Sequence, residues 1–424
     1  MSEWKLEMWQ DVIRAAAAVK ASDVFWKPGT PPHAKMKGVV EMAPEGDSGP
    51  WPVMRQEDTE AIARSLMSDR AWERFLEFPE KDIGLSIEGV CRLRINIYRE
   101  RGNVCGVMRI IPLDILTIDD LDMPPVLKDI SMSPQGLVLV TGPTGCGKST
   151  TLAAMIDHVN RNRKANIITV EDPIEYVHRD RNSIVSQREV GIDTEDFQPA
   201  LKYAMRQAPD VILIGEMRDT ITMSVAMQAA ETGHLVFSTV HTTSAAETLE
   251  RIVNMFPPHE KQQICMRLSR TLRAVISQSL VARKESQGRV AAMEIMVVTP
   301  TIQKFIEDGK PSEMYEAIVE GGHWGMMTKN QSLLYLYRDG FISADQALFW
   351  AGNRTEMRQM IRRLDGERSD AARKAAEAAE AEERLRRTRQ RAAQQQAAAQ
   401  AAQAAQEAQG NGSAPPPPPA GENG

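Results

Sequence analysis

The chain has 424 residues, a hydrophobic content of 42% and a formal net charge of −6. This length predicts two to three domains, and the hydrophobic fraction is enough for a sizeable buried core. The acidic balance excludes a strongly basic nucleic-acid footprint over the whole molecule, so no nucleic-acid partner is expected. The sequence has no run of about 18 apolar residues and its N-terminus does not resemble a secretion signal, so membrane association is expected only through partners.

The first 112 residues predict a small α+β domain. Apolar residues over 4–20 recur at helical spacing, which indicates an amphipathic helix. The runs VCRLRINIY (90–98) and VCGVMRII (104–111) predict two strands joined by a hairpin-like connection. The proline-rich stretch 113–135 then predicts an interdomain linker that contains one short helical piece.

An alternation of strands and helices begins at residue 136 and predicts a mostly parallel sheet with helices on both faces. The apolar runs that predict its strands are GLVLVT, NIITVED, DVILIGE and LVFSTVH. After about residue 245 we expect helices up to residue 365, including one through HEKQQICMRLSRTLRAVISQSL. Residues 366–424 are rich in Ala, Gln, Glu and Arg before a run of prolines, and they predict a helix followed by a disordered end. The expected fold class is therefore α/β, preceded by an α+β domain.

The strongest chemical signal is GPTGCGKS at residues 142–149, which fits the pattern G-x-x-x-x-G-K-[ST] in full. Its glycines let the backbone curl so that successive N–H groups face phosphate oxygens, and the following helix adds the positive end of its dipole. Lys148 can reach the β- and γ-phosphates, and the Ser149 hydroxyl suits Mg²⁺. A chance glycine turn is the alternative, but the complete match between a predicted strand and a predicted helix disfavours it. The expected nucleotide-binding residues are Gly142, Pro143, Thr144, Gly145, Cys146, Gly147, Lys148, Ser149 and Thr150.

A catalytic acid is expected at Glu216, where the run DVILIGE ends. Ligands bind at the carboxyl ends of strands in such sheets, so this side chain should face the phosphates. It could orient or polarise the attacking water, or hold Mg²⁺ directly or through water. An acid that ends a strand and caps the next helix would look the same in the sequence, but the nearby P-loop favours the functional interpretation.

Two further segments carry candidate polar residues. EDPIE clusters Glu171, Asp172 and Glu175, and repelling carboxylates need a cation or a basic partner unless they form an exposed turn. ETGHLVFSTVH brackets a strand with His234 and His241 on opposite faces, so the two histidines need not share a metal. Each could sense the γ-phosphate or link the acids to the next subunit, although a lone histidine is more often a hydrogen-bonded structural residue.

These segments, in this order, closely resemble the secretion-superfamily hexameric ATPases, and most closely the type IV pilus retraction ATPases of the PilT/PilU family. The matching pieces are the Walker A segment GPTGCGKSTTLAAM, the Asp box ITVEDPIEYVH, the Walker B segment RQAPDVILIGEMRD and the His box ETGHLVFSTVHTTSAAETLERI. The likeness runs from about residue 20 to residue 350 and includes ASDVFWKPGTPP and QREVGIDTEDF. The tetracysteine motif of assembly-type relatives is missing, which favours the retraction branch.

The resemblance implies a homohexamer in which a PAS-like domain (1–112) is joined through the linker to a RecA-like ATPase domain with C-terminal helices (136–365). It implies that ATP and Mg²⁺ bind between the two domains and near the adjacent subunit. It also implies arginines from the N-terminal domain that neutralise charge on the phosphates. The catalytic residues implied for this sequence are Glu216, Glu171, His234, His241, Arg94, Arg101 and Arg109.

The function implied by the resemblance is a motor that drives pilus retraction and twitching motility through an inner-membrane platform protein, from the cytoplasmic face of the membrane. One departure is TIQKFIED at residues 301–308, where many retraction ATPases have AIRNLIRE. This departure leaves open an accessory ring subunit that modulates a dominant, paralogous retraction ATPase with little hydrolysis of its own. A nucleic-acid translocase is a third alternative, which the acidic balance disfavours.

Overall fold

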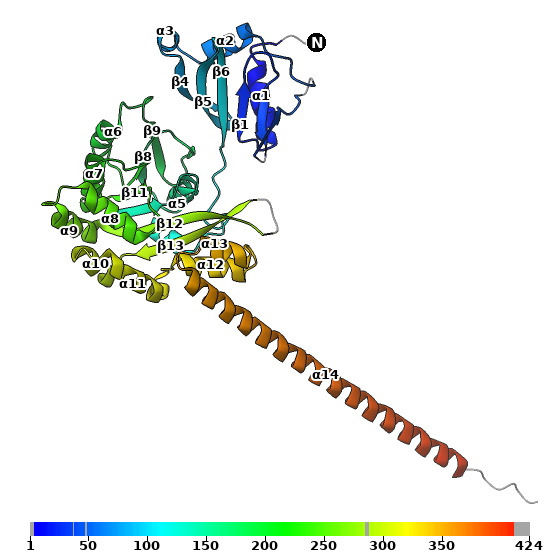
Figure 1. Ribbon diagram of the computed structural model, residues 1–424. Helices are drawn as coiled ribbons and strands as arrows, with labels where there is room; N and C mark the ends of the chain where they lie inside the picture. The colour runs from blue at the N-terminus through cyan, green and yellow to red at the C-terminus, as the bar shows by residue number, and fades with distance from the viewer. Residues whose placement is uncertain (1–3, 37, 47–48, 285–287, 411–424) are drawn as a thin grey trace, which may run out of the picture. The chain divides into compact units, whose positions relative to one another are not determined.

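The computed structural model describes residues 4–36, 38–46, 49–284 and 288–410. The chain divides into two compact units, Met1–Gly352 and Asn353–Gly424. The larger unit contains two sheets with their surrounding helices, and Figure 1 labels most of these strands and helices. The proline-rich end, for which disorder is expected, lies outside the described residues.

The N-terminal sheet is antiparallel throughout and has six strands in the order β3-β2-β1-β6-β5-β4. Its strands are β1 (Asp23–Trp26), β2 (His33–Met36), β3 (Val39–Met42), β4 (Glu80–Ile87), β5 (Cys91–Glu100) and β6 (Asn103–Pro112). The helices of this region are α1 (Met8–Ala18), α2 (Gln56–Ser65) and α3 (Asp69–Glu77). Along β5, Leu93, Ile95 and Ile97 are buried whereas Arg94 and Asn96 are exposed, because successive side chains point to opposite faces. This sheet therefore presents Arg94 on the face opposite its core.

The second sheet has seven strands in the order β13-β12-β7-β11-β10-β8-β9, and only β12 and β13 pair antiparallel. Its strands are β7 (Gly136–Thr141), β8 (Asn166–Glu171), β9 (Ile184–Glu189), β10 (Val211–Ile214), β11 (Leu235–Val240), β12 (Leu272–Ala282) and β13 (Arg289–Val297). The α-helices up to β12 are α4 (Val126–Ser131), α5 (Lys148–Asn162), α6 (Phe197–Ala204), α7 (Thr220–Glu231), α8 (Ala245–Met255) and α9 (Lys261–Thr271). Those after β13 are α10 (Pro300–Glu307), α11 (Met314–Glu320), α12 (Lys329–Arg338) and α13 (Ala344–Trp350), with short 3-10 turns at Pro311–Glu313 and Gly321–Trp324.

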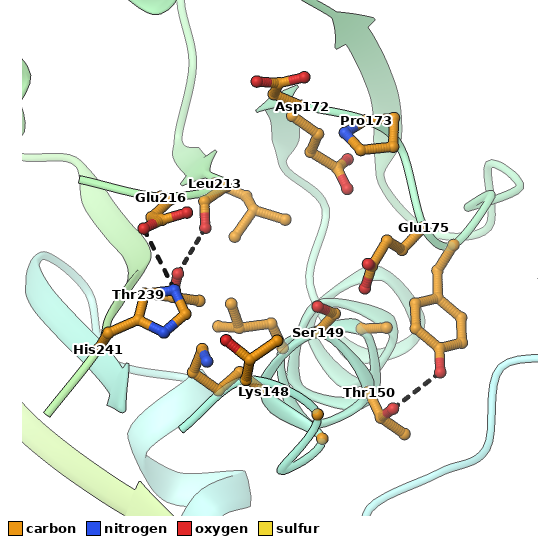
Figure 2. Close-up of a pocket in the computed structure, with 18 of the residues that line it drawn as sticks. Lys148, Ser149, Thr150, Asp172, Pro173, Glu175, Leu213, Glu216, Thr239 and His241 are labelled. Carbon is orange, nitrogen blue, oxygen red and sulfur yellow. Dashed lines mark hydrogen bonds and ion pairs between the residues drawn. The ribbon is translucent and has the colours of Figure 1, made fainter. Parts of the chain in front are cut away.

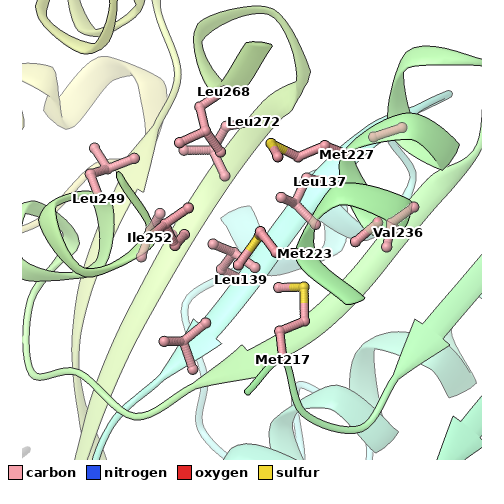
Figure 3. Close-up of a cluster of buried hydrophobic side chains, with 14 of the residues drawn as sticks. Leu137, Leu139, Met217, Met223, Met227, Val236, Leu249, Ile252, Leu268 and Leu272 are labelled. Carbon is pink, nitrogen blue, oxygen red and sulfur yellow. The ribbon is translucent and has the colours of Figure 1, made fainter. Parts of the chain in front are cut away.

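Strand β7 lies between two hydrophobic layers. Leu137 and Leu139 belong to the layer that includes Met223 of α7, as Figure 3 shows. Val138 and Val140 belong to the other layer, which includes the apolar face of α5. Both faces of the sheet are therefore covered, which is why its strands are continuous apolar runs in the sequence. The expected α/β class with an N-terminal α+β region is confirmed.

The expected helix through residues 259–280 ends earlier than predicted. Helix α9 stops at Thr271, and the chain continues as β12, which pairs with β7 and β13. Strand β12 is buried on both faces, so its apolar run shows no alternation that would separate it from a buried helix. The prediction of helices alone after residue 245 is therefore wrong for β12 and β13.

The second unit contains the helix α14 (Arg354–Gly410), which has 57 residues and begins before the predicted boundary at residue 366. Its charged side chains pair at four-residue spacing, as Arg363 does with Glu367 at 3.1 Å and Arg387 with Glu383 at 2.6 Å. Such pairs stabilise an exposed helix by a few tenths of a kcal/mol each, about 0.2–0.5 kcal/mol. Among the helices in the described ranges, α14 included, none combines the length and the apolar character that crossing a bilayer requires.

Candidate nucleotide-binding site

A cavity of about 620 Å³ lies where β7, β8, β10 and β11 end. Small-molecule sites typically have volumes of roughly 300–1,000 Å³, and α/β sheets bind their ligands at the carboxyl ends of the strands. Segments that are far apart in the sequence meet here, as Figure 2 shows. The predicted site residues that line it are Arg94, Thr144, Gly145, Gly147, Lys148, Ser149, Thr150, Glu171, Glu216 and His241.

The P-loop leaves β7 and enters α5 through glycines with positive φ. Gly142 has a φ of +141°, and a Cβ there would lie 2.5 Å from the main-chain oxygen of Gln278. Gly147 has a φ of +90° and is the N-cap of α5. The Lys148 ammonium donates to the carbonyl oxygens of Gly142 at 2.9 Å and Pro143 at 3.2 Å, so it is held over the loop. Of the predicted binding residues, Gly142, Pro143 and Cys146 shape the loop without lining the cavity.

Glu216 lies just beyond β10 and has a basic partner at each carboxylate oxygen. Its Oε2 accepts from Arg218 Nη2 at 2.7 Å, and its Oε1 lies 3.2 Å from His241 Nε2 (Figure 2 draws the histidine contact). Burial works against ionisation of Glu216, but Arg218, His241 and Lys148 outweigh it and lower the pKa of this carboxyl. The side chain is therefore an anion at neutral pH, as a group that orients water or a cation must be.

Glu171 ends β8 and is almost completely buried. Its Oε1 accepts hydrogen bonds from Thr169 Oγ1 at 2.6 Å and from Gln187 Nε2 at 3.0 Å. Burial raises the pKa of Glu171, and these hydrogen bonds oppose the rise only in part. The same Gln187 amide donates to the carbonyl oxygen of Tyr176, whose hydroxyl lies 2.8 Å from Thr150 Oγ1. The Asp box is thus tied to the first turn of the P-loop helix.

The two histidines of the His box lie at opposite ends of β11. His241 follows the strand and lines the cavity, where burial and the charge of Lys148 lower its pKa against the effect of Glu216. His234 precedes the strand, and its Nδ1 lies 2.9 Å from the carbonyl oxygen of Ala229. The structure does not bring His234 to the cavity of its own chain, so its catalytic assignment stays a prediction that requires a neighbouring subunit.

The three candidate arginines of the N-terminal sheet are also separated. Arg94 lines the cavity, and Arg109 is its cross-strand partner on β6 but donates to Asp23 Oδ1 at 3.0 Å. Arg101 lies in the turn between β5 and β6 with a φ of +51°. It lies seven positions along the chain from Arg94, or about 23 Å at 3.3 Å per residue. Only Arg94 reaches the cavity of its own chain, and the other two assignments stay predictions.

The structure adds site residues that the sequence analysis missed. Arg218 pairs with Glu216, and Tyr176 reaches Thr150 from the Asp box. Both lie inside motifs that the sequence already marks, EMRD and DPIEY. The available signal was that each residue is next to an acidic residue in its motif. Gln278 touches the P-loop from β12, and no local signal marked it because β12 was expected to be helical.

Ser149 and Glu216 line the same cavity, and both offer oxygen atoms. Oxygen is the ligand that Mg²⁺ prefers, and this ion usually keeps several waters beside one or two protein groups. The donor set therefore fits a magnesium ion held partly through water.

Comparison with known proteins identifies the family to which this chain belongs. Residues 90–409 match the family model described as "Type II/IV secretion system protein". The chain is 44% identical over 337 residues to the type IV pilus retractation ATPase PilT of Pseudomonas aeruginosa, which covers 80% of this chain and 96% of that protein. It is 38% identical over 362 residues to the type IV pilus ATPase PilU of the same organism, with 85% and 93% covered. The chain belongs to the PilT/PilU family.

A solved structure supports the same placement in the PilT/PilU family. The crystal structure of the pilus retraction motor PilT with bound ADP superposes with a TM-score of 0.76 at 36% identity, covering 84% of this chain and all of that one. The X-ray structure of the Legionella pneumophila ATPase DotB gives a TM-score of 0.67 at 25% identity, with 82% and 96% covered. The family and the ATPase class expected from the sequence are confirmed, and a member of this fold holds a nucleotide.

Proposed function

We propose that this protein is the ATP-hydrolysing hexameric motor of a type IV pilus system and that it drives pilus retraction through an inner-membrane platform protein. The observation that carries the proposal is the meeting of Lys148 and Ser149 with the ionised Glu216 in one cavity. The identity to PilT and PilU over most of the chain supports the choice of pilus retraction. A PilT-type motor would work at the cytoplasmic face of the membrane and would reach the membrane only through its partners.

In this proposal the P-loop amides and Lys148 bind the phosphates, and Glu216 orients the attacking water. Arg94 approaches from the N-terminal sheet and neutralises charge on the transferred phosphoryl group. Closure of the N-terminal domain on the ATPase domain would complete the site, and hydrolysis would let it reopen. Staggered closure around a ring would then turn the platform protein.

We also propose that ATP binds with Mg²⁺, held by Ser149 and, directly or through water, by Glu216. When bound, the ion would neutralise charge between the β- and γ-phosphates. The Ser149 hydroxyl would supply one of the oxygen ligands of the ion, and the Glu216 carboxylate would accept a hydrogen bond from water.

The cellular test is deletion of the gene, followed by imaging of pili in cells that carry either the intact gene or Glu216→Gln. Retraction predicts excess surface pili and lost twitching in the deletion strain, restored by the intact gene but not by the variant. Loss of pili in the deletion strain would instead assign the protein to pilus assembly.

A second candidate is an accessory ring subunit that modulates a paralogous motor with little hydrolysis of its own. It is favoured by the segment 301–308 on α10, where Lys304 pairs with Asp308 at 2.9 Å and the arginines of many relatives are absent. Purified protein separates the two candidates. Ring formation and ATP binding with hydrolysis at the buffer background would support the accessory subunit, whereas sustained turnover supports the motor.

A further inference from the structure

Gln278 is a buried amide on β12 that holds the back of the P-loop. Its side chain is 3% exposed and makes two hydrogen bonds to the loop and its helix. Nε2 donates to the carbonyl oxygen of Cys146 at 2.6 Å, and Oε1 accepts from Thr151 Oγ1 at 2.7 Å. The residue does not line the cavity, so it cannot touch a nucleotide directly.

The register of β12 fixes where this amide lies. Strands β12 and β7 run parallel, with Ser277 opposite Thr141, and the hydroxyls of these two residues are 2.7 Å apart. Gln278 therefore follows immediately at the level where β7 ends and the P-loop begins. Its main-chain oxygen lies so close to Gly142 that a Cβ there would approach to 2.5 Å. One residue thus contacts the loop at its first glycine and again at Cys146.

The hydrogen bond to Cys146 has a consequence for the next amide. The peptide that joins Cys146 to Gly147 is planar and trans, so its C=O and N–H point in opposite directions. The carbonyl oxygen accepts from Gln278, which does not line the cavity, so the N–H of Gly147 points away from Gln278. Gly147 itself lines the cavity. Inward-facing amides are what allow such a loop to bind phosphate.

We propose that Gln278 is a positioning residue that sets the peptide orientation of the P-loop and thereby the affinity of the site for nucleotide phosphates. The inference rests on the proposed function, because it assumes that the loop binds a nucleoside triphosphate. A Gln in this position that served packing alone would affect stability but not the affinity of the folded protein.

The test uses the full-length protein and a fluorescent ATP analogue. Gln278→Met keeps the length of the side chain but removes the donor to Cys146. The expected result is a rise in Kd of about tenfold to a hundredfold, since losing a buried hydrogen bond costs on the order of 1–3 kcal/mol. In ATP hydrolysis the weaker binding should raise KM and leave kcat nearly unchanged, because the loop binds the substrate and the transition state equally.

Two further variants serve as controls. Thr151→Val removes the bond to Oε1, together with the 3.2 Å contact of the same hydroxyl with the carbonyl oxygen of Gly147, but it leaves the donor to Cys146 in place. Its Kd should change by less than about threefold. Ser332→Ala removes another buried hydrogen bond, the one from Met293 N at 3.0 Å, and should lower the melting temperature without changing Kd. If the Met variant does not fold, Gln278→Asn replaces it, since the shorter amide cannot reach Cys146.

The inference is overturned if the position 278 variants melt earlier, as Ser332→Ala does, while their folded fraction binds the analogue with wild-type Kd. Failure of the proposed function would look different. In that case the wild-type protein itself would neither bind nor hydrolyse ATP, whatever the variants did.

Discussion

His178 gives the protein a defined sensitivity to acid. It ends the Asp box, is 8% exposed, and its Nδ1 has no hydrogen-bond partner among the described residues. Burial lowers the pKa of this imidazole from its ordinary value of 6.5 to about 4, although the charge of Asp157 opposes the shift. The native state therefore holds His178 neutral, whereas the unfolded chain takes up a proton as soon as the pH falls below 6.5. The contribution of the neutral His178 to the free energy of unfolding is fully present above pH 6.5, and it is lost as the pH falls toward 4.

The size of the loss follows from the two pKa values. Between pH 7 and pH 5, His178 becomes protonated in the unfolded state but stays neutral in the native state. This difference stabilises the unfolded state and lowers the free energy of unfolding by about 2 kcal/mol. His178→Gln removes the titrating group, so its free energy of unfolding should fall by about 2 kcal/mol less than that of the wild type over this range. Urea unfolding followed by tryptophan fluorescence measures both, and the exposed His259→Gln serves as the matched control. Equal losses in the wild type and in His178→Gln would refute the reasoning.

Three further predictions concern the core, the loop and the arginines. Phe237→Ala, at a fully buried position of β11, should destabilise the protein by about 3–5 kcal/mol in urea unfolding, and a loss below about 1 kcal/mol would contradict the packing. Gly142→Ala should abolish binding of an ATP analogue, because its Cβ would lie 2.5 Å from main-chain oxygen; near-normal affinity would show that the loop can shift. Arg94→Gln should reduce ATP turnover by at least about tenfold in a phosphate-release assay, more than Arg101→Gln does, and the reverse order would place Arg101 at the phosphates of a neighbouring subunit.

The parts of the molecule that the sequence predicts are those encoded by local pattern. The P-loop needs a strand, a set of glycines and a helix in direct succession, so its place between β7 and α5 follows from eight residues. Glu216 was predicted because carboxyl ends of parallel strands meet at one edge of a sheet. Each of these inferences uses residues that are close together in the chain.

The parts that the sequence does not predict depend on contacts between distant segments. Strand β12 is apolar on both faces, and only its pairing with β7 distinguishes it from a helix. Gln278 consequently had no visible role. The charge state of Glu216 depends on Arg218, two residues further on, and also on His241, which comes from the distant loop after β11. The sequence also does not show that Arg109, unlike Arg94, forms an ion pair with Asp23, a residue 86 positions away in the chain.

The central claim is that a triphosphate bound by the P-loop is hydrolysed with the help of Glu216. The most direct measurement compares ATP binding and phosphate release for the wild-type protein and Glu216→Gln, since the amide keeps the shape of the side chain but not its charge. The variant should bind the ATP analogue with an affinity close to that of the wild type, while its turnover falls by at least about a hundredfold. Turnover within about twofold of the wild type, at equal nucleotide occupancy, would contradict the account.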